Sequence, residues 1–93
     1  MRGLTVPMPE VSRFYGIVIR IFYDDHNPPH FHAEYGEYEA LVSINTLAIM
    51  GGRLPARAFG MVAEWASLHQ QELLAAWERA KRLQPPGQIQ PLS

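Results

Sequence analysis

Alternating apolar and polar positions dominate the first half of the chain and predict strands. The run from Gly16 to Tyr23 is rich in β-branched and aromatic residues and is the clearest strand. Polar and apolar positions alternate from His30 to Tyr35, and apolar residues then recur at every second position from Tyr38 to Ile44. Leu47 to Met50 is a fourth candidate strand, ended by a turn at Gly51-Gly52. The short connections favour an antiparallel meander.

A different period governs the chain after Pro55. Apolar residues recur at spacings of three and four, which is the pattern of an amphipathic helix. These stripe positions are Phe59, Val62, Ala66, His69, Leu73, Trp77 and Ala80. One helix running to Arg82 would be about 40 Å long, which is longer than a domain of this size is wide. We therefore expect a break near His69-Gln70, although no glycine or proline marks it and one long helix remains the alternative.

Together these patterns predict a single α+β domain. We expect an antiparallel sheet of three to four strands with one or two C-terminal helices packed on one face. A chain of 93 residues supports one core. Residues 1–7 are expected to be an N-terminal extension and residues 8–83 the domain. Residues 84–93, with three prolines, are expected to be an irregular or disordered tail.

The composition excludes several classes of protein. With 47% apolar and 11% aromatic residues, the chain is typical of a folded globular protein. The absence of cysteine rules out disulfides and thiol chemistry and agrees with a cytoplasmic location. No apolar run reaches the roughly 18–20 residues that a membrane-spanning helix requires, so we expect no membrane association.

One short segment, Asp24 to His32, holds three of the four histidines. Histidine changes its charge near neutral pH and is the commonest metal ligand. Side chains two positions apart on a strand share a face, so His30, His32 and Glu34 should lie together on the open face of the sheet. Phe31, between the two histidines, should point into the core. The segment is the candidate functional site.

A divalent metal such as zinc suits this pattern. His30, His32 and Glu34 can offer two nitrogens and a carboxylate to one ion. Asp25 or His26 can add a further ligand from the loop before the strand, which the Pro-Pro pair should keep rigid. Metal binding is therefore one interpretation of the segment.

Catalysis is a second interpretation. His26, His30 and His32 are candidate catalytic residues, because two imidazoles held together can act as a general acid and a general base. The protein would then be a metal-binding hydrolase or a His-dependent nuclease. A nuclease needs a cation near its transition state, and Arg20 is the nearby candidate.

The charge around the histidines favours a contact surface. Between Asp24 and Glu39 there are five acidic residues and no Lys or Arg. Nucleic-acid binding at this segment is therefore disfavoured, because it depends on cations that neutralise phosphates. We rank contact with a small protein partner or another ligand first, metal binding second and catalysis third. A homo-oligomer could form through Val18, Phe22 and Leu41 on the open face. A purely structural role, with the imidazoles bonded to backbone carbonyls, fits equally well.

Four stretches carry a family resemblance: Met8 to Ile17, Asp25 to Tyr35, Leu54-Pro55 and Glu64 to Trp77. The most distinctive element is Asp-His-x-Pro-Pro-His-x-His. In these stretches the chain resembles a family of small bacterial proteins designated domain of unknown function 4160. The resemblance implies no reaction and no catalytic residues. It does imply a protein partner, because some members are thought to be encoded beside a second small protein, as in toxin–antitoxin pairs. It also implies that the family sequence begins at Met8.

Overall fold

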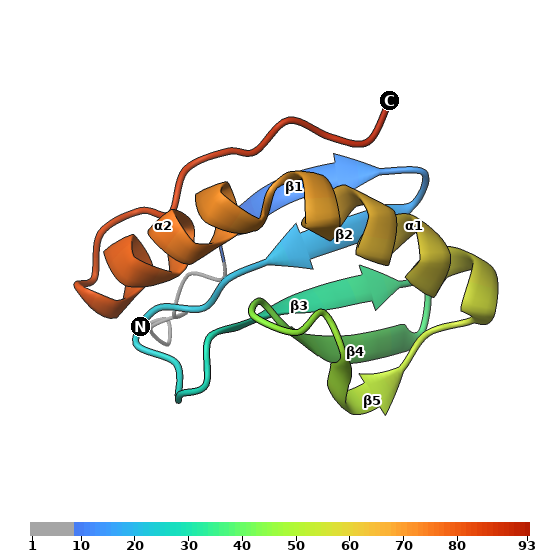
Figure 1. The fold of residues 1–93 in the computed structure, drawn as a ribbon, viewed down its shortest axis with the longest axis horizontal. Coiled ribbons are helices and arrows are strands. Elements are labelled where there is room, and N and C mark those ends of the chain that lie inside the picture. The colour runs from blue at the N-terminus through green and yellow to red at the C-terminus, as the bar shows by residue number, and fades with distance from the viewer. Residues whose placement is uncertain (1–8) are drawn as a thin grey trace, which may run out of the picture.

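The computed structural model describes residues 9–93, so the predicted N-terminal extension at residues 1–7 lies outside the described residues. Within them, five strands precede two helices (Figure 1). The elements are β1 (Glu10–Phe14), β2 (Ile17–Arg20), β3 (His30–Tyr35), β4 (Tyr38–Ser43), β5 (Ile49–Arg53), α1 (Ala56–Leu68) and α2 (Gln70–Lys81). The predicted α+β class is confirmed, but the expected strand count of three to four is too low.

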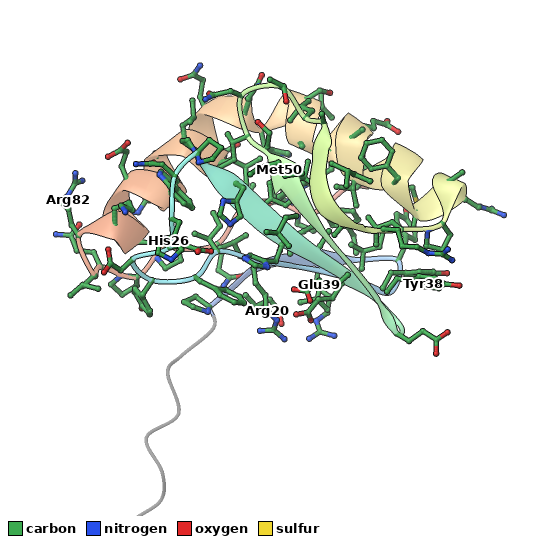
Figure 2. The ribbon with its side chains drawn as sticks, turned by 90° about the horizontal axis from the view of Figure 1, so that it is seen from below. Arg20, His26, Tyr38, Glu39, Met50 and Arg82 are labelled. Atoms are coloured by element: carbon green, nitrogen blue, oxygen red, sulfur yellow. The ribbon has the colours of Figure 1, made fainter. Side chains whose placement is uncertain are left out.

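The sheet is an antiparallel meander with both helices on one face. Consecutive strands are neighbours, in the order β1-β2-β3-β4-β5, and α1 and α2 pack across one side of the sheet (Figure 1). Phe31 and Ala33 of β3 are fully buried in the core, which confirms the predicted inward face of that strand. Arg20 and Glu39 project from the opposite side, away from the helices (Figure 2).

Strand β1 was not predicted, because a bulge hides its pattern. Its register with β2 shifts between Glu10 and Ser12. Val11 and Ser12 are consequently both buried, although they are adjacent in sequence. A bulge adds one residue to a strand and breaks the alternation of faces. The two-residue period that identifies a strand in a sequence is therefore missing here.

Strand β5 begins and ends later than predicted, and it contains the two glycines that were expected to form a turn. It runs from Ile49 to Arg53, and its register with β4 shifts between Leu41 and Val42. Gly52 has a φ of +72°, and a Cβ atom at this position would overlap the carbonyl oxygen of Glu39. Only glycine fits this close approach to β4. The glycines therefore permit the pairing instead of ending it.

The helical region breaks where the length argument predicted. His69 separates α1 from α2 with φ −125° and ψ 24°, and its N–H donates to Ala66 O. The Gln70 side-chain amide donates to Ile44 O at 2.6 Å, which ties the joint to the end of β4. Trp65 and Trp77, one on each helix, are buried core residues. Among the described residues, neither helix has the length and apolar character needed to cross a membrane.

The C-terminal residues have no regular structure but pack against the domain. Ile89 is buried, and its N–H donates to Val11 O at 2.7 Å along the outer edge of β1. The indole N–H of Trp65 donates to Gln90 O at 2.8 Å. Residues 84–93 thus contact both the sheet and α1 (Figure 1).

Candidate metal centre

The histidine segment lies where the β2–β3 loop meets the C-terminal end of α2. His30 and His32 belong to β3, and Asp25 belongs to the loop before it. The loop is fixed to both layers of the fold: Asp24 N–H donates to Ala80 O of α2 at 3.2 Å, and Pro29 O accepts from Ile44 N–H at 3.0 Å. These bonds hold Asp25 beside the start of β3.

One carboxylate oxygen lies next to both histidines. Asp25 Oδ2 is 3.0 Å from His30 Nε2 and 3.1 Å from His32 Nε2. The three ligating atoms all lie within 4.8 Å of one another. Two imidazole nitrogens and one carboxylate oxygen therefore converge on a single point.

The other nitrogen of each ring has a partner outside this cluster. His30 Nδ1 lies 2.8 Å from Pro28 O, and His32 Nδ1 lies 3.1 Å from Glu39 Oε2. A carbonyl oxygen and an ionised carboxylate can only accept, so the hydrogen-bond network assigns a proton to each Nδ1. In the neutral rings, both Nε2 atoms then carry a lone pair.

With a proton on each Nδ1 and none on Nε2, the point where the two histidines meet Asp25 lacks positive charge. Two Nε2 lone pairs face a carboxylate oxygen that can itself only accept. Acceptors at these distances repel each other unless a cation lies among them. A metal ion bound by all three atoms would supply this positive charge, as would protons on the rings.

The surroundings of Asp25 lower the pKa of its carboxyl group. Its partial burial raises the pKa of the carboxyl group, but hydrogen bonds with the His32 side chain and with the His26 backbone N–H act in the opposite direction. Positive charge at the two rings adds to these bonds, and the net effect holds the Asp25 pKa below its ordinary value. A metal ion between the three side chains would supply positive charge at the same place while both rings stay neutral. The His26 N–H binds Oδ1 at 2.8 Å, which leaves Oδ2 for the histidines.

Aromatic rings shield the cluster from water. The side chains of His30 and His32 are only 5% and 9% exposed. Phe22 stacks on His32 with ring centroids 4.0 Å apart and planes 4° apart, and Trp77 lies 5.2 Å from the His30 ring. The expected open face is therefore covered at this end. Reduced access of water strengthens electrostatic interactions within the cluster.

A lysine from α2 holds the loop from the outside. Lys81 Nζ donates to the backbone oxygen of Asp25 at 2.9 Å and lies 3.6 Å from the Asp24 carboxylate. Its ammonium group is also 5.9 Å from the centre of the Trp77 ring. The C-terminal turn of α2 thus contacts the same loop that presents Asp25.

The structure gathers some of the predicted site residues and separates others. Asp25, His30 and His32 form the cluster. Glu34 lies outside it, and its carboxylate accepts a hydrogen bond from Arg20 at 3.2 Å. His26 is exposed, and its backbone N–H, not its ring, contacts the cluster. The hydrogen bond from His30 Nδ1 to Pro28 O is of the kind expected for a structural role, in which an imidazole binds a backbone carbonyl.

Sequence reasoning missed Glu39, Phe22, Lys81 and Trp77 as neighbours of the histidines. A signal for Glu39 did exist. A tight turn at Gly36-Glu37 sets the β3–β4 register, which pairs Glu34 with Glu39 and places Glu39 diagonally from His32. The approach of Lys81 depends on how α2 packs against the loop, and local patterns do not encode that arrangement.

The fold and the site define a small two-layer α+β domain with a cluster of two buried histidines and a partly buried aspartate. The family model described as Domain of unknown function (DUF4160) matches residues 16–78, which is more than half of the chain, and the protein belongs to this family. The matched range includes the complete cluster and Glu39, whereas Lys81 lies beyond it. No curated protein and no solved structure matches the chain.

Proposed function

We propose that this protein is a divalent-metal-binding domain whose ligands are Asp25 Oδ2, His30 Nε2 and His32 Nε2. The observation that carries the proposal is the position of the four ring nitrogens relative to their neighbours. Both Nδ1–H groups have acceptors outside the cluster, and both Nε2 atoms face one carboxylate oxygen. Metal-binding histidines characteristically donate their second N–H to a carbonyl or a carboxylate, which fixes the ring and its tautomer.

The donor set favours zinc or a similar first-row ion. Imidazole nitrogen suits such ions, whereas Mg²⁺ and Ca²⁺ prefer shells made of oxygen. Ligand atoms in a tetrahedral zinc site lie about 3.3 Å apart, given bonds of about 2.0–2.1 Å. The separations of 3.0 and 3.1 Å from Asp25 Oδ2 to the two nitrogens are close to this spacing. The two Nε2 atoms lie within 4.8 Å of each other, so binding of one ion would require the two rings to move to the tetrahedral spacing as well.

Burial favours a metal over two ring protons. Full protonation would place two imidazolium charges on rings whose centroids are 5.3 Å apart, each more than nine-tenths buried. Buried charges are costly unless each is well compensated. One divalent ion supplies the same charge through direct bonds to all three donors and leaves both rings neutral.

The surroundings of the cluster favour an ion over a larger ligand, because the three side chains converge on a single point and the two rings are buried. The buried rings also leave little imidazole surface for direct contact with a partner. A protein partner, a two-protein module of the toxin–antitoxin kind and catalysis by the histidines stay predictions that rest on the sequence.

Calorimetric titration of tag-free protein with Zn²⁺ tests the proposal. We expect one ion per chain for the wild type and no measurable binding of Mg²⁺. Asp25→Asn removes the anionic ligand at nearly constant shape, so we expect affinity for Zn²⁺ to fall at least about a hundredfold. His26→Ala is the matched control from the same loop. It keeps the backbone N–H that binds Asp25, so we expect its affinity to stay within about threefold of the wild type.

Unfolding experiments provide an independent readout. A ligand that binds only the folded state, at a hundred times its Kd, stabilises it by about 2.7 kcal/mol. Zn²⁺ should therefore raise the stability of the wild type and of His26→Ala but not that of Asp25→Asn. The proposal is wrong if the wild type binds no zinc, or if folded Asp25→Asn binds it as tightly as the wild type does.

A further inference from the structure

The C-terminal part of α2 presents two side chains to the histidine site. Trp77 and Lys81 are four residues apart and therefore lie on the same face of the helix. Trp77 lies against the His30 ring, and Lys81 binds the backbone oxygen of Asp25. Trp77 thus contacts the candidate ligand His30, and Lys81 contacts the backbone of the candidate ligand Asp25.

We propose that Lys81 is a positioning residue that sets metal affinity by holding the Asp25 loop against β3. This inference rests on the proposed function. Lys81 Nζ contacts the peptide oxygen of Asp25 at 2.9 Å, so Oδ2 stays available for the histidines and an ion. An ammonium group bonded to the carboxylate itself would instead compete with the metal.

The contacts of Lys81 bridge the loop to the helix. Its ammonium group is also 3.6 Å from the Asp24 carboxylate, and a backbone bond joins Asp24 N–H to Ala80 O. The bond from His26 N–H to Asp25 Oδ1 lies within the loop and cannot fix the loop to α2. Loss of the Lys81 side chain therefore removes a direct link between the Asp25 peptide and the helix.

A positioning role and simple electrostatic repulsion predict opposite changes in metal affinity when the Lys81 side chain is removed. A fixed positive charge near a metal site repels the ion, so its removal alone would tighten metal binding. A side chain that holds a ligand in place has the reverse effect, because the unbound site must then be ordered at the moment of binding. The sign of the change in affinity separates the two roles.

The experiment compares Zn²⁺ affinity in Lys81→Met, Lys81→Arg and Arg82→Gln by calorimetry. Lys81→Met should weaken binding about tenfold or more, as is typical when a group supporting a metal ligand is removed. Lys81→Arg retains a donor to the Asp25 carbonyl and should recover most of the affinity. Arg82→Gln removes a neighbouring exposed charge and should leave the Zn²⁺ affinity unchanged. Equal or tighter binding by Lys81→Met overturns the inference.

A second readout needs no metal. Amide hydrogen exchange in the metal-free protein should be faster at Asp24 in Lys81→Met than in Arg82→Gln, while exchange in β3 stays similar in both variants. If the wild type fails to bind zinc, the proposed function is wrong, and this comparison alone decides whether Lys81 holds the loop. Unchanged exchange at Asp24 would refute the positioning role in either case.

Discussion

The two nitrogens of each histidine in the cluster have different surroundings, and this difference defines the site. Nδ1 of His30 faces a carbonyl and Nδ1 of His32 faces the Glu39 carboxylate, while both Nε2 atoms face Asp25. A histidine that donates through Nδ1 presents a lone pair at Nε2. The outer acceptors therefore prepare the inner nitrogens for a cation. Glu39 is the acceptor that can be removed without altering the backbone.

Replacement of Glu39 tests this residue-scale account. Glu39→Ala leaves the His32 N–H without its carboxylate, so we expect Zn²⁺ affinity to fall about tenfold. The matched control is Glu37→Ala, an exposed acidic residue in the preceding turn. Calorimetry measures both affinities, and ¹⁵N NMR of the imidazole reports the tautomer. Equal losses in the two variants would mean that Glu39 acts only through its charge.

At the scale of elements, regular alternation was readable from the sequence, whereas irregular pairing was not. The predicted strand from His30 to Tyr35 is β3 with the same bounds, and this placed His30 and His32 correctly on one strand. Strand β1 was not predicted, and strand β5 was predicted with the wrong bounds, because each is paired with its neighbour through a bulge. The sequence also indicated Asp25 or His26 as a further candidate ligand, but the contact with Lys81 depends on packing between distant elements.

Gly52 provides a stability test of the β4–β5 pairing. Gly52→Ala forces a side chain into a left-handed backbone and against Glu39 O, so we expect a loss of about 1–3 kcal/mol in the free energy of unfolding. Gly51→Ala is the control, because a Cβ there meets nothing within 4 Å. Urea denaturation should show a change of less than about 1 kcal/mol for Gly51→Ala. Similar losses in both variants would contradict the close approach.

At the scale of the molecule, the C-terminal segment closes one side of the domain. It lies along the outer edge of β1, where Ile89 N–H donates to Val11 O at 2.7 Å, and Gln90 O accepts from the Trp65 indole. Covering an edge strand satisfies its backbone groups and prevents pairing with other chains. Proline-rich composition at residues 84–93 favoured an irregular segment, but it gave no indication of this packing.

Ile89 should consequently contribute to global stability. Ile89→Ala removes a side chain of a residue that is 5% exposed, and we expect the free energy of unfolding to fall by about 2–4 kcal/mol. Leu92→Ala, at a partly buried position in the same segment, should cost about 1 kcal/mol. Chemical denaturation measures both values. A negligible effect of Ile89→Ala would show that the segment does not belong to the cooperative fold.

The most direct test of the central claim is the position of zinc in a crystal of the tag-free protein grown with one equivalent of the ion. Anomalous diffraction at the zinc edge locates the metal independently of any affinity measurement. We predict one peak at bonding distance, about 2.0–2.2 Å, from Asp25 Oδ2, His30 Nε2 and His32 Nε2. An anomalous peak only at surface groups such as His26 or the His69–Glu72 pair, with none at the cluster, would contradict the account.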